Sequence, residues 1–169
     1  HKKDKYIIKK IAQELDYQGP ILDYVDRQAC RINFSCKVIY NDLIALGGTE
    51  RKSKTLQFPN IPIEFLPDFI RGYFDGDGSI SVDKNYHLRF RLCAHRPELL
   101  EDIALYLSKK YNCSYSLSQD KRQLWELSIS TKYAKQIFKD LYSLNSIRLD
   151  RKYQKYLEYI NHETMTSLL

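Results

Sequence analysis

Along this chain, apolar residues at helical spacing are followed by apolar residues at every second position, and this order occurs twice. Residues 4–15 (DKYIIKKIAQEL) align without gaps with residues 96–107 (RPELLEDIALYL). Both segments carry apolar residues at positions i, i+1, i+4 and i+8, which is the stripe of an amphipathic helix. Further along, residues 31–37 (RINFSCK) match residues 126–132 (ELSISTK), where every second residue is apolar, as in a strand covered on one face. The chain is therefore predicted to hold two copies of one structural unit.

The second copy supplies a full set of predicted elements. They are a helix over about 64–75, strands near 79–84 and 86–94, a helix near 97–110, strands near 113–119 and 123–130, and a helix near 132–144. The first copy supplies only the later ones: a helix near 4–16, strands near 20–26 and 29–35, and a helix near 37–46. Each copy then reaches a basic stretch, ERKSK at 50–54 and LDRKYQK at 149–155.

These elements set the expected domain organisation and an α+β fold class with the order αββαββα. Residues 1–62 are expected to hold a partial first repeat and a linker, the latter at 47–62, where Gly and Pro punctuate the sequence. Residues 63–160 are expected to hold the second repeat, closed by a helix near 150–160, and residues 161–169 a tail. The first copy's equivalent of the helix at 69–78 falls before residue 1, so we expect the chain to start inside its first repeat.

The stretch FIRGYFDGDGSI at residues 69–80 combines a helical apolar face with glycines and paired acids. Gly72 and Gly76 are four residues apart, a spacing that lets two helix backbones approach closely. Each glycine costs a helix about 1 kcal/mol relative to alanine. Close packing against a second helix is a reason to accept that cost, so both glycines are predicted to be helix-packing residues.

The segment DGDGS allows two other interpretations. A calcium-binding EF-hand loop needs glycine at its sixth position and an acid at its twelfth. Counted from Asp75, these positions hold Ile80 and Tyr86, which excludes that loop. A plain turn explains Gly76 and Gly78 but neither the Gly72–Gly76 spacing nor the duplication, and it stays open as an alternative.

The segment IRGYFDGDG at 70–78 resembles the signature of the LAGLIDADG homing endonucleases. In the order of that signature, the matching positions are Ile70, Gly72, Asp75, Asp77 and Gly78. Arg71 departs from it, because the family usually has a small residue there. Together with the αββαββα order and the duplication, the resemblance extends from about residue 4 to 160.

The resemblance implies a duplicated αββαββα fold, truncated at the N-terminus of its first repeat, whose antiparallel sheets form a DNA-binding saddle. It implies a site-specific double-stranded DNA endonuclease that hydrolyses phosphodiester bonds with Mg²⁺ or Mn²⁺, encoded in an intron or intein. A non-cleaving DNA-binding regulator or an RNA-splicing maturase on the same fold is the alternative. The full two-repeat protein is expected to be a monomer, and a chain without the first motif helix could instead form a homodimer through the helix at 64–76.

The same resemblance assigns candidate catalytic residues. The second acid of the motif is the metal ligand in this family, which carries over to Asp77, with the carbonyl of Gly76 as a lesser ligand. A basic residue near the scissile phosphate carries over to Lys132, at the junction of a strand and a helix, and to Lys37 in the first copy. A positioned ammonium would stabilise developing negative charge. Otherwise these lysines are two of the chain's 27 basic residues, exposed to solvent.

The polar faces of the predicted strands are expected to contact DNA. Arginine can read guanine in the major groove, and small polar groups can read bases directly or through water. The expected DNA-binding residues of the second copy are Ser79, Ser81, Asp83, Lys84, His87, Arg89, Arg91, Ser116, Ser118, Lys121, Arg122, Glu126 and Ser128, and those of the first are Arg31 and Asn33. Without the resemblance, a solvated sheet face would be the favoured interpretation.

The amino-acid composition indicates which classes of binding partner and which compartment to expect. A net charge of +6 and a pI near 9.0 favour a polyanionic partner such as nucleic acid. No apolar run approaches the length of a membrane span, and no secretory signal is present, so we expect no membrane partner. The four cysteines and four histidines lack the spacing of a zinc site or disulfide framework, which predicts four buried thiols in a reducing compartment. We expect a cytoplasmic protein, with association with the nucleoid or location in an organellar matrix as the alternatives.

Overall fold

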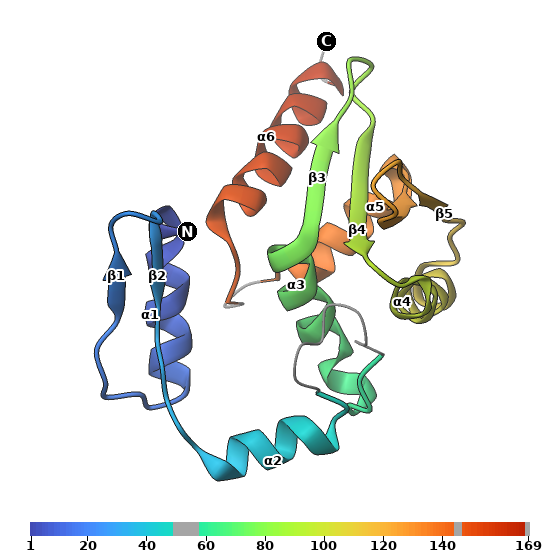
Figure 1. Ribbon diagram of the computed structural model, residues 1–169. Helices are drawn as coiled ribbons and strands as arrows, with labels where there is room; N and C mark the ends of the chain where they lie inside the picture. The colour runs from blue at the N-terminus through green and yellow to red at the C-terminus, as the bar shows by residue number, and fades with distance from the viewer. Residues whose placement is uncertain (49–57, 144–146, 168–169) are drawn as a thin grey trace.

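The computed structural model describes residues 1–48, 58–143 and 147–167, and within them the chain forms helices and two antiparallel sheets. The second-copy elements are the 3₁₀ turn η3 (Ile63–Phe65), α3 (Leu66–Asp77), β3 (Gly78–Val82), β4 (Leu88–Ala94), α4 (Pro97–Tyr111), β5 (Ser116–Gln119), β6 (Trp125–Ile129), α5 (Thr131–Leu141) and α6 (Asp150–Ser167). The first-copy elements are the 3₁₀ turn η1 (Lys2–Asp4), α1 (Lys5–Glu14), β1 (Leu22–Tyr24), β2 (Ala29–Arg31) and α2 (Lys37–Ala45). The α+β fold class is confirmed (Figure 1).

The four strands of the second copy form one antiparallel sheet in the order β3-β4-β6-β5. Helices α4 and α5 pack on one face of this sheet, and α6 runs beside its β3 edge. The apolar residues that alternate along the strands face the helices and are buried: Ile80, Leu88, Phe90, Leu92, Leu127 and Ile129. The expected half-covered sheet is therefore present, with its other face polar.

Helix α3 lies below the sheet in the view of Figure 1 and continues directly into β3. Its Phe74 is fully buried, with its ring centroid 4.9 Å from that of Phe90 and 5.2 Å from that of Phe138. The Tyr73 hydroxyl donates a hydrogen bond of 2.7 Å to the carbonyl of Cys93 on β4. A Cβ added at Gly78 would lie 2.6 Å from the Phe74 carbonyl oxygen, so the junction between helix and strand requires glycine. These contacts fix the end of α3 against the sheet.

The first-copy elements lie to one side of this core (Figure 1). They dock on the start of α6: the Tyr6 hydroxyl donates to the carbonyl of Arg148 at 3.2 Å, and Arg151 pairs with the buried Asp4 at 3.3 Å. Helix α2 buries none of its residues, whereas the matching α5 buries Ala134, Ile137, Phe138 and Leu141. The first copy is therefore held mainly through polar contacts at one end.

Several boundaries differ from the sequence-based expectation. The strands of the first copy cover only 22–24 and 29–31, far less than the expected 20–26 and 29–35, because these two short strands pair only with each other in the described structure. Helix α6 continues through residue 160 to Ser167, into the segment expected to be a tail. Most of the linker expected at 47–62 lies outside the described residues.

All four cysteines are free thiols, as expected, but the prediction that all are buried is wrong. Cys113 is buried, Cys30 and Cys93 are half-buried, and Cys36 is exposed because it precedes the uncovered helix α2. None of the helices in the described part of the chain has the length and apolar character that a membrane-spanning helix needs.

Candidate functional site

The two acids of the motif have opposite environments at the end of α3. Asp77 is the last residue of the helix and is exposed; its carboxylate makes no hydrogen bond or ion pair with any described residue. Asp75 is only 5% exposed and accepts hydrogen bonds from the Tyr142 hydroxyl at 3.0 Å and from the backbone N–H of Leu149 at 2.8 Å. Burial raises the pKa of Asp75, although both hydrogen bonds oppose the shift. The carboxylate of Asp77 is thus free to bind a ligand, whereas that of Asp75 stabilises the fold through its two hydrogen bonds.

Lys152 is a residue of this site that the sequence analysis missed. It is 5% exposed, and its ammonium donates to the carbonyl oxygens of Phe74 at 2.6 Å, Asp75 at 2.9 Å and Gly78 at 2.6 Å. These carbonyls lie at the C-terminal end of α3, where the helix leaves acceptors unpaired and carries partial negative charge. Burial lowers the pKa of Lys152 to about 8. The only signal in the sequence was its place in a basic stretch that both copies share.

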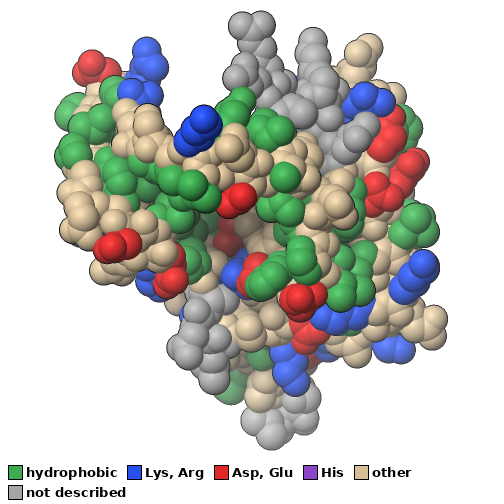
Figure 2. Space-filling model, turned by 90° about the horizontal axis from the view of Figure 1, so that it is seen from below, with side chains coloured by type: hydrophobic (Ala, Val, Ile, Leu, Met, Phe, Trp, Pro, Cys, Tyr) green, Lys and Arg blue, Asp and Glu red, His purple; other side chains and the backbone are tan. Residues whose placement is uncertain are grey.

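Gly72 and Gly76 border a groove between α3 and α1. The groove has a volume of about 400 Å³, and the apolar side chains Ile7, Ile8 and Ile11 of α1 line its other side. In Figure 2, which looks at the molecule from below, the surface is hollowed near its centre, between the side that holds α1 and the side that holds α3. Apart from the adjoining residues and backbone of α3 itself, no described atom lies within 4 Å of a Cβ added at either glycine. Their role in helix packing stays a prediction.

The two predicted catalytic lysines are exposed at the first turns of their helices, Lys132 in α5 and Lys37 in α2. The Lys132 ammonium lies 5.3 Å from the centroid of the Tyr133 ring. Asp77 and Lys132 lie next to different positions along β4. Asp77 precedes Gly78, which pairs with Leu92. Lys132 comes three residues after Ile129, which pairs with Phe90, nearer the β3–β4 hairpin. No contact in the described structure joins either lysine to Asp77, so their catalytic roles also stay predictions.

The structure brings most of the predicted DNA-binding residues of the second copy onto one sheet face. The register aligns them in cross-strand rows: Ser79 with Arg91, Ser128 and Ser116; Ser81 with Arg89; and Glu126 with Ser118. The Arg91 Nε lies 3.6 Å from a Glu126 carboxylate oxygen. This face therefore combines two arginines, one acid and several hydroxyls within four strands.

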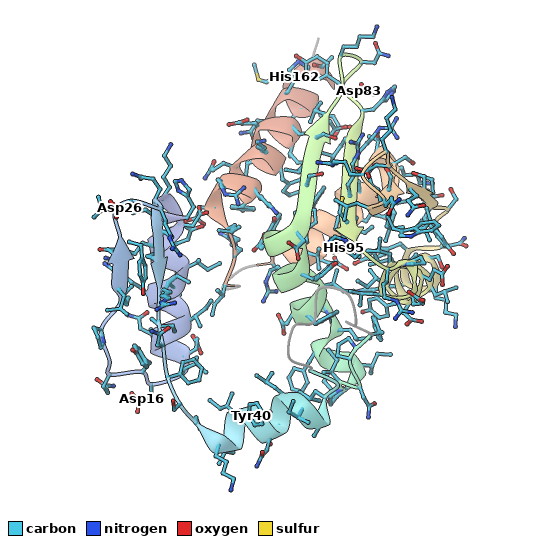
Figure 3. All side chains as sticks on the ribbon, in the orientation of Figure 1. Asp16, Asp26, Tyr40, Asp83, His95 and His162 are labelled. Carbon is cyan, nitrogen blue, oxygen red and sulfur yellow. The ribbon has the colours of Figure 1, made fainter. Side chains whose placement is uncertain are left out.

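The remaining predicted DNA-binding residues lie in turns or on the first copy. In the β3–β4 turn, Asp83 accepts hydrogen bonds from the backbone N–H groups of Asn85 at 2.8 Å and His87 at 3.0 Å, which lower its pKa. Figure 3 shows Asp83 at this hairpin tip, close to His162 near the end of α6. The other turn residues are Lys84, Lys121 and Arg122, all exposed. Arg31 and Asn33 are exposed on the separate first-copy hairpin and the segment after it, outside the four-stranded sheet.

The oxygen atoms at the end of α3 meet part of what a divalent metal ion requires. Within the ranges that the structure describes, no three His, Cys, Asp or Glu groups gather as a metal site. Asp77 offers a free carboxylate, the ligand type that Mg²⁺ and Mn²⁺ take, next to the backbone carbonyl of Gly76. These oxygens fit a hard cation but fall short of its roughly six ligands. DNA phosphate, water or a further carboxylate would have to supply the rest.

Part of the chain is similar to a known protein family and to segments of three known proteins. Residues 64–142 match the family model of the LAGLIDADG-like domain. Over 103 residues, 55% of the chain, the sequence is 29% identical to the probable translation initiation factor IF-2 of Methanocaldococcus jannaschii. Over 78 residues, 46% of the chain, it is 32% identical to the DNA-directed RNA polymerase subunit Rpo1C of the same organism. Over 132 residues, 75% of the chain, it is 26% identical to the reverse gyrase of Thermococcus kodakarensis.

The chain spans less than a tenth of each of these relatives: 9% of the initiation factor, 8% of the polymerase subunit and 8% of the reverse gyrase. The family match covers the motif helix α3, the four-stranded sheet and helices α4 and α5. The chain therefore contains a segment, residues 64–142, that is similar to the LAGLIDADG-like domain.

Proposed function

We propose that the chain is part of a site-specific endonuclease that hydrolyses double-stranded DNA with a divalent metal ion. The observation that carries the proposal is the free carboxylate of Asp77 at the point where α3 passes into β3. It lies at the start of the strand whose polar face bears Ser79 and Ser81. Binding DNA alone gives no reason to keep an unpaired acid beside phosphate, whereas metal-dependent hydrolysis requires one.

Each part of the site has a chemical role in this proposal. Asp77 and the carbonyl of Gly76 would hold Mg²⁺ or Mn²⁺. The bound cation would neutralise charge on the scissile phosphate and lower the pKa of the attacking water. Lys152 fixes the carbonyls around the metal ligands, as its three hydrogen bonds indicate. Lys132 and Lys37 would come near the phosphate backbone and stabilise its charge.

The polar sheet face would supply DNA recognition. A twisted antiparallel ribbon fits the major groove, where Arg89 and Arg91 can donate to guanine and Glu126 can accept from the amino group of cytosine. Hydroxyl groups of the serine rows suit direct or water-mediated contacts. The net charge of +6 supports binding to the phosphate backbone.

The relatives favour an intein as the genetic context. Their names describe a translation initiation factor, an RNA polymerase subunit and a reverse gyrase, which have no common activity. Each resembles this chain over less than a tenth of its length. A segment that recurs inside unrelated hosts is the pattern of an inserted element, so we propose none of the host activities for this chain.

Cleavage of a randomised duplex library in Mg²⁺ tests the proposal. The unaltered chain is compared with Asp77→Asn and with Asp102→Asn, which makes the same change of charge on an exposed residue of α4. Bound duplexes are recovered in parallel in Ca²⁺. We expect Asp77→Asn alone to abolish cleavage, with binding retained in all three. Selective binding without cleavage by any of them would favour the non-cleaving regulator or maturase, and equal cleavage by all three would contradict the metal site.

A further inference from the structure

Arg71 is the residue at which the motif departs from its family, and the structure shows what it contacts. Its side chain is only 12% exposed. The guanidinium donates to the carbonyl of Ile147 at 2.8 Å and to that of Leu141 at 3.4 Å, and it pairs with Asp68 at 2.6 Å. Arg71 therefore joins α3 to both the end of α5 and the approach to α6.

Asp75 repeats this link one helical turn later. Residues four apart lie on the same helix face, so Arg71 and Asp75 point towards the same segment. The carboxylate of Asp75 holds Tyr142 at the end of α5 and the backbone of Leu149, the residue just before α6. Arg71 and Asp75 therefore both form hydrogen bonds with the end of α5 and with the residues just before α6.

Lys152 of α6 forms hydrogen bonds with the C-terminal end of α3. It lies three residues after Leu149, in the first turn of α6, and its ammonium binds the carbonyls of Phe74, Asp75 and Gly78. Those carbonyls bracket Gly76 and Asp77. Arg71 and Asp75 of α3 thus contact the segment that leads into α6, and Lys152 of α6 contacts the end of α3. We call these hydrogen bonds the α3–α6 contacts.

We propose that Arg71 and Asp75 are positioning residues of the proposed nuclease centre, which place Lys152 and through it hold Gly76 and Asp77 in the geometry that binds metal. This inference rests on the proposed function. It gives a reason for an arginine where a small residue is usual: a short side chain at position 71 could not reach Ile147 or Leu141. It also explains why the first acid of the motif is buried while the second is free.

The decisive variant is Arg71→Met, which keeps the apolar stem and removes every donor. Arg71→Lys keeps one charged donor group but not the forked geometry. Ile103→Val, at a fully buried position of α4 that makes none of these polar contacts, is the control for a modest loss of stability, about 0.5–1.5 kcal/mol. The three chains are compared with the unaltered one for kcat, for DNA affinity in Ca²⁺, and for amide hydrogen exchange at residues 76–78.

We expect Arg71→Met to lower kcat by up to about 100-fold, because a displacement near 1 Å at a reacting group has an effect of that size. DNA affinity in Ca²⁺ should stay within about two-fold, since the sheet face is unchanged. Exchange at residues 76–78 should rise at least about ten-fold. Arg71→Lys should fall between, and Ile103→Val should match the unaltered chain.

Unchanged exchange at residues 76–78 in Arg71→Met would overturn the inference, and so would a fall in kcat matched by Ile103→Val. A fall in DNA affinity as large as the fall in kcat would overturn it too, because it would show a general structural effect. Absence of cleavage by the unaltered chain would instead contradict the proposed function. The exchange measurement separates the two failures, because it does not depend on cleavage.

Discussion

At the residue scale, the site depends on how three charged groups share one helix end. A carboxylate at a helix C-terminus is electrostatically unfavourable, and Asp77 occupies that position without a hydrogen bond or ion pair to any described residue. Lys152 places its positive charge on the same carbonyls and offsets part of that cost. An acid kept at an unfavourable position is typical of a functional group rather than of a structural one.

The two acids are therefore expected to differ in their effect on stability. Asp75→Ala removes a buried acceptor and leaves the Tyr142 hydroxyl and the Leu149 N–H unpaired, so we expect a loss of about 1–3 kcal/mol. Asp77→Ala should change the free energy of unfolding by less than about 0.5 kcal/mol. Urea denaturation measures both, and equal losses would show that Asp77 also has a structural role.

Lys152 makes a prediction about pH. The folded chain releases the proton of Lys152 near pH 8, whereas an unperturbed lysine in the unfolded chain keeps it to about pH 10.4. Between these values the unfolded state binds more protons, so this group makes the free energy of unfolding rise with pH, by at most about 1.4 kcal/mol per unit.

Lys152→Met removes that contribution. The stability difference between the unaltered chain and Lys152→Met should therefore grow in favour of the unaltered chain from pH 8 to pH 10. Denaturation curves of both proteins at several pH values test this, and a constant difference would refute a lowered pKa.

At the element scale, hydrophobic periodicity predicted the helices and strands of the second copy because each is covered on one face by a shared core. The alternation predicted one covered face, and Ile80, Phe90 and Leu127 of β3, β4 and β6 are buried there, whereas Val82 at the end of β3 is 39% exposed. The strands of the first copy were predicted too long, since pattern alone does not show whether a neighbouring strand exists.

The polar links of the site were not predictable in this way. The motif marked Asp75 and Asp77 but not which one is buried, and Arg71 stood out only as an exception. Lys152 lies 74 residues after Gly78, whose carbonyl it binds. Contacts so distant in sequence depend on the packing of α6 against α3, which no local pattern encodes.

Two glycines of α3 and its junction test the packing of this element. Gly78→Ala places a methyl group against the backbone of Phe74, and we expect a loss of about 1–3 kcal/mol. Gly72→Ala meets no described atom within 4 Å and should stabilise the chain by up to about 1 kcal/mol through helix propensity. Thermal denaturation compares them. A destabilising Gly72→Ala would show that its face is already packed in this chain.

At the scale of the whole molecule, the helices cover one face of the four-stranded sheet and leave the polar face open beside the end of α3. Recognition and chemistry would then share one surface, with Arg89 and Arg91 on β4 and Asp77 at the start of the neighbouring strand β3. The first-copy elements attach at the start of α6. The start of α6 therefore contacts both the first-copy elements and helix α3 of the second copy.

Arg89→Ala tests the proposed DNA face. Loss of one base-reading arginine should weaken selective binding by about 1–3 kcal/mol and relax the preference at one position of the target. Lys109→Ala removes the same charge from α4, on the covered side of the sheet, and should leave selective binding unchanged. Fluorescence anisotropy with a selected duplex measures both, and equal losses would argue for unspecific attraction by net charge.

The most direct test of the whole account is cleavage of a selected duplex in Mg²⁺ by the unaltered chain and by Asp77→Asn, with binding measured in Ca²⁺. The account predicts cleavage by the unaltered chain, none by Asp77→Asn, and equal affinity of both for the duplex. Cleavage by Asp77→Asn at the unaltered rate would contradict the assignment of the metal ligand and, with it, the proposed site.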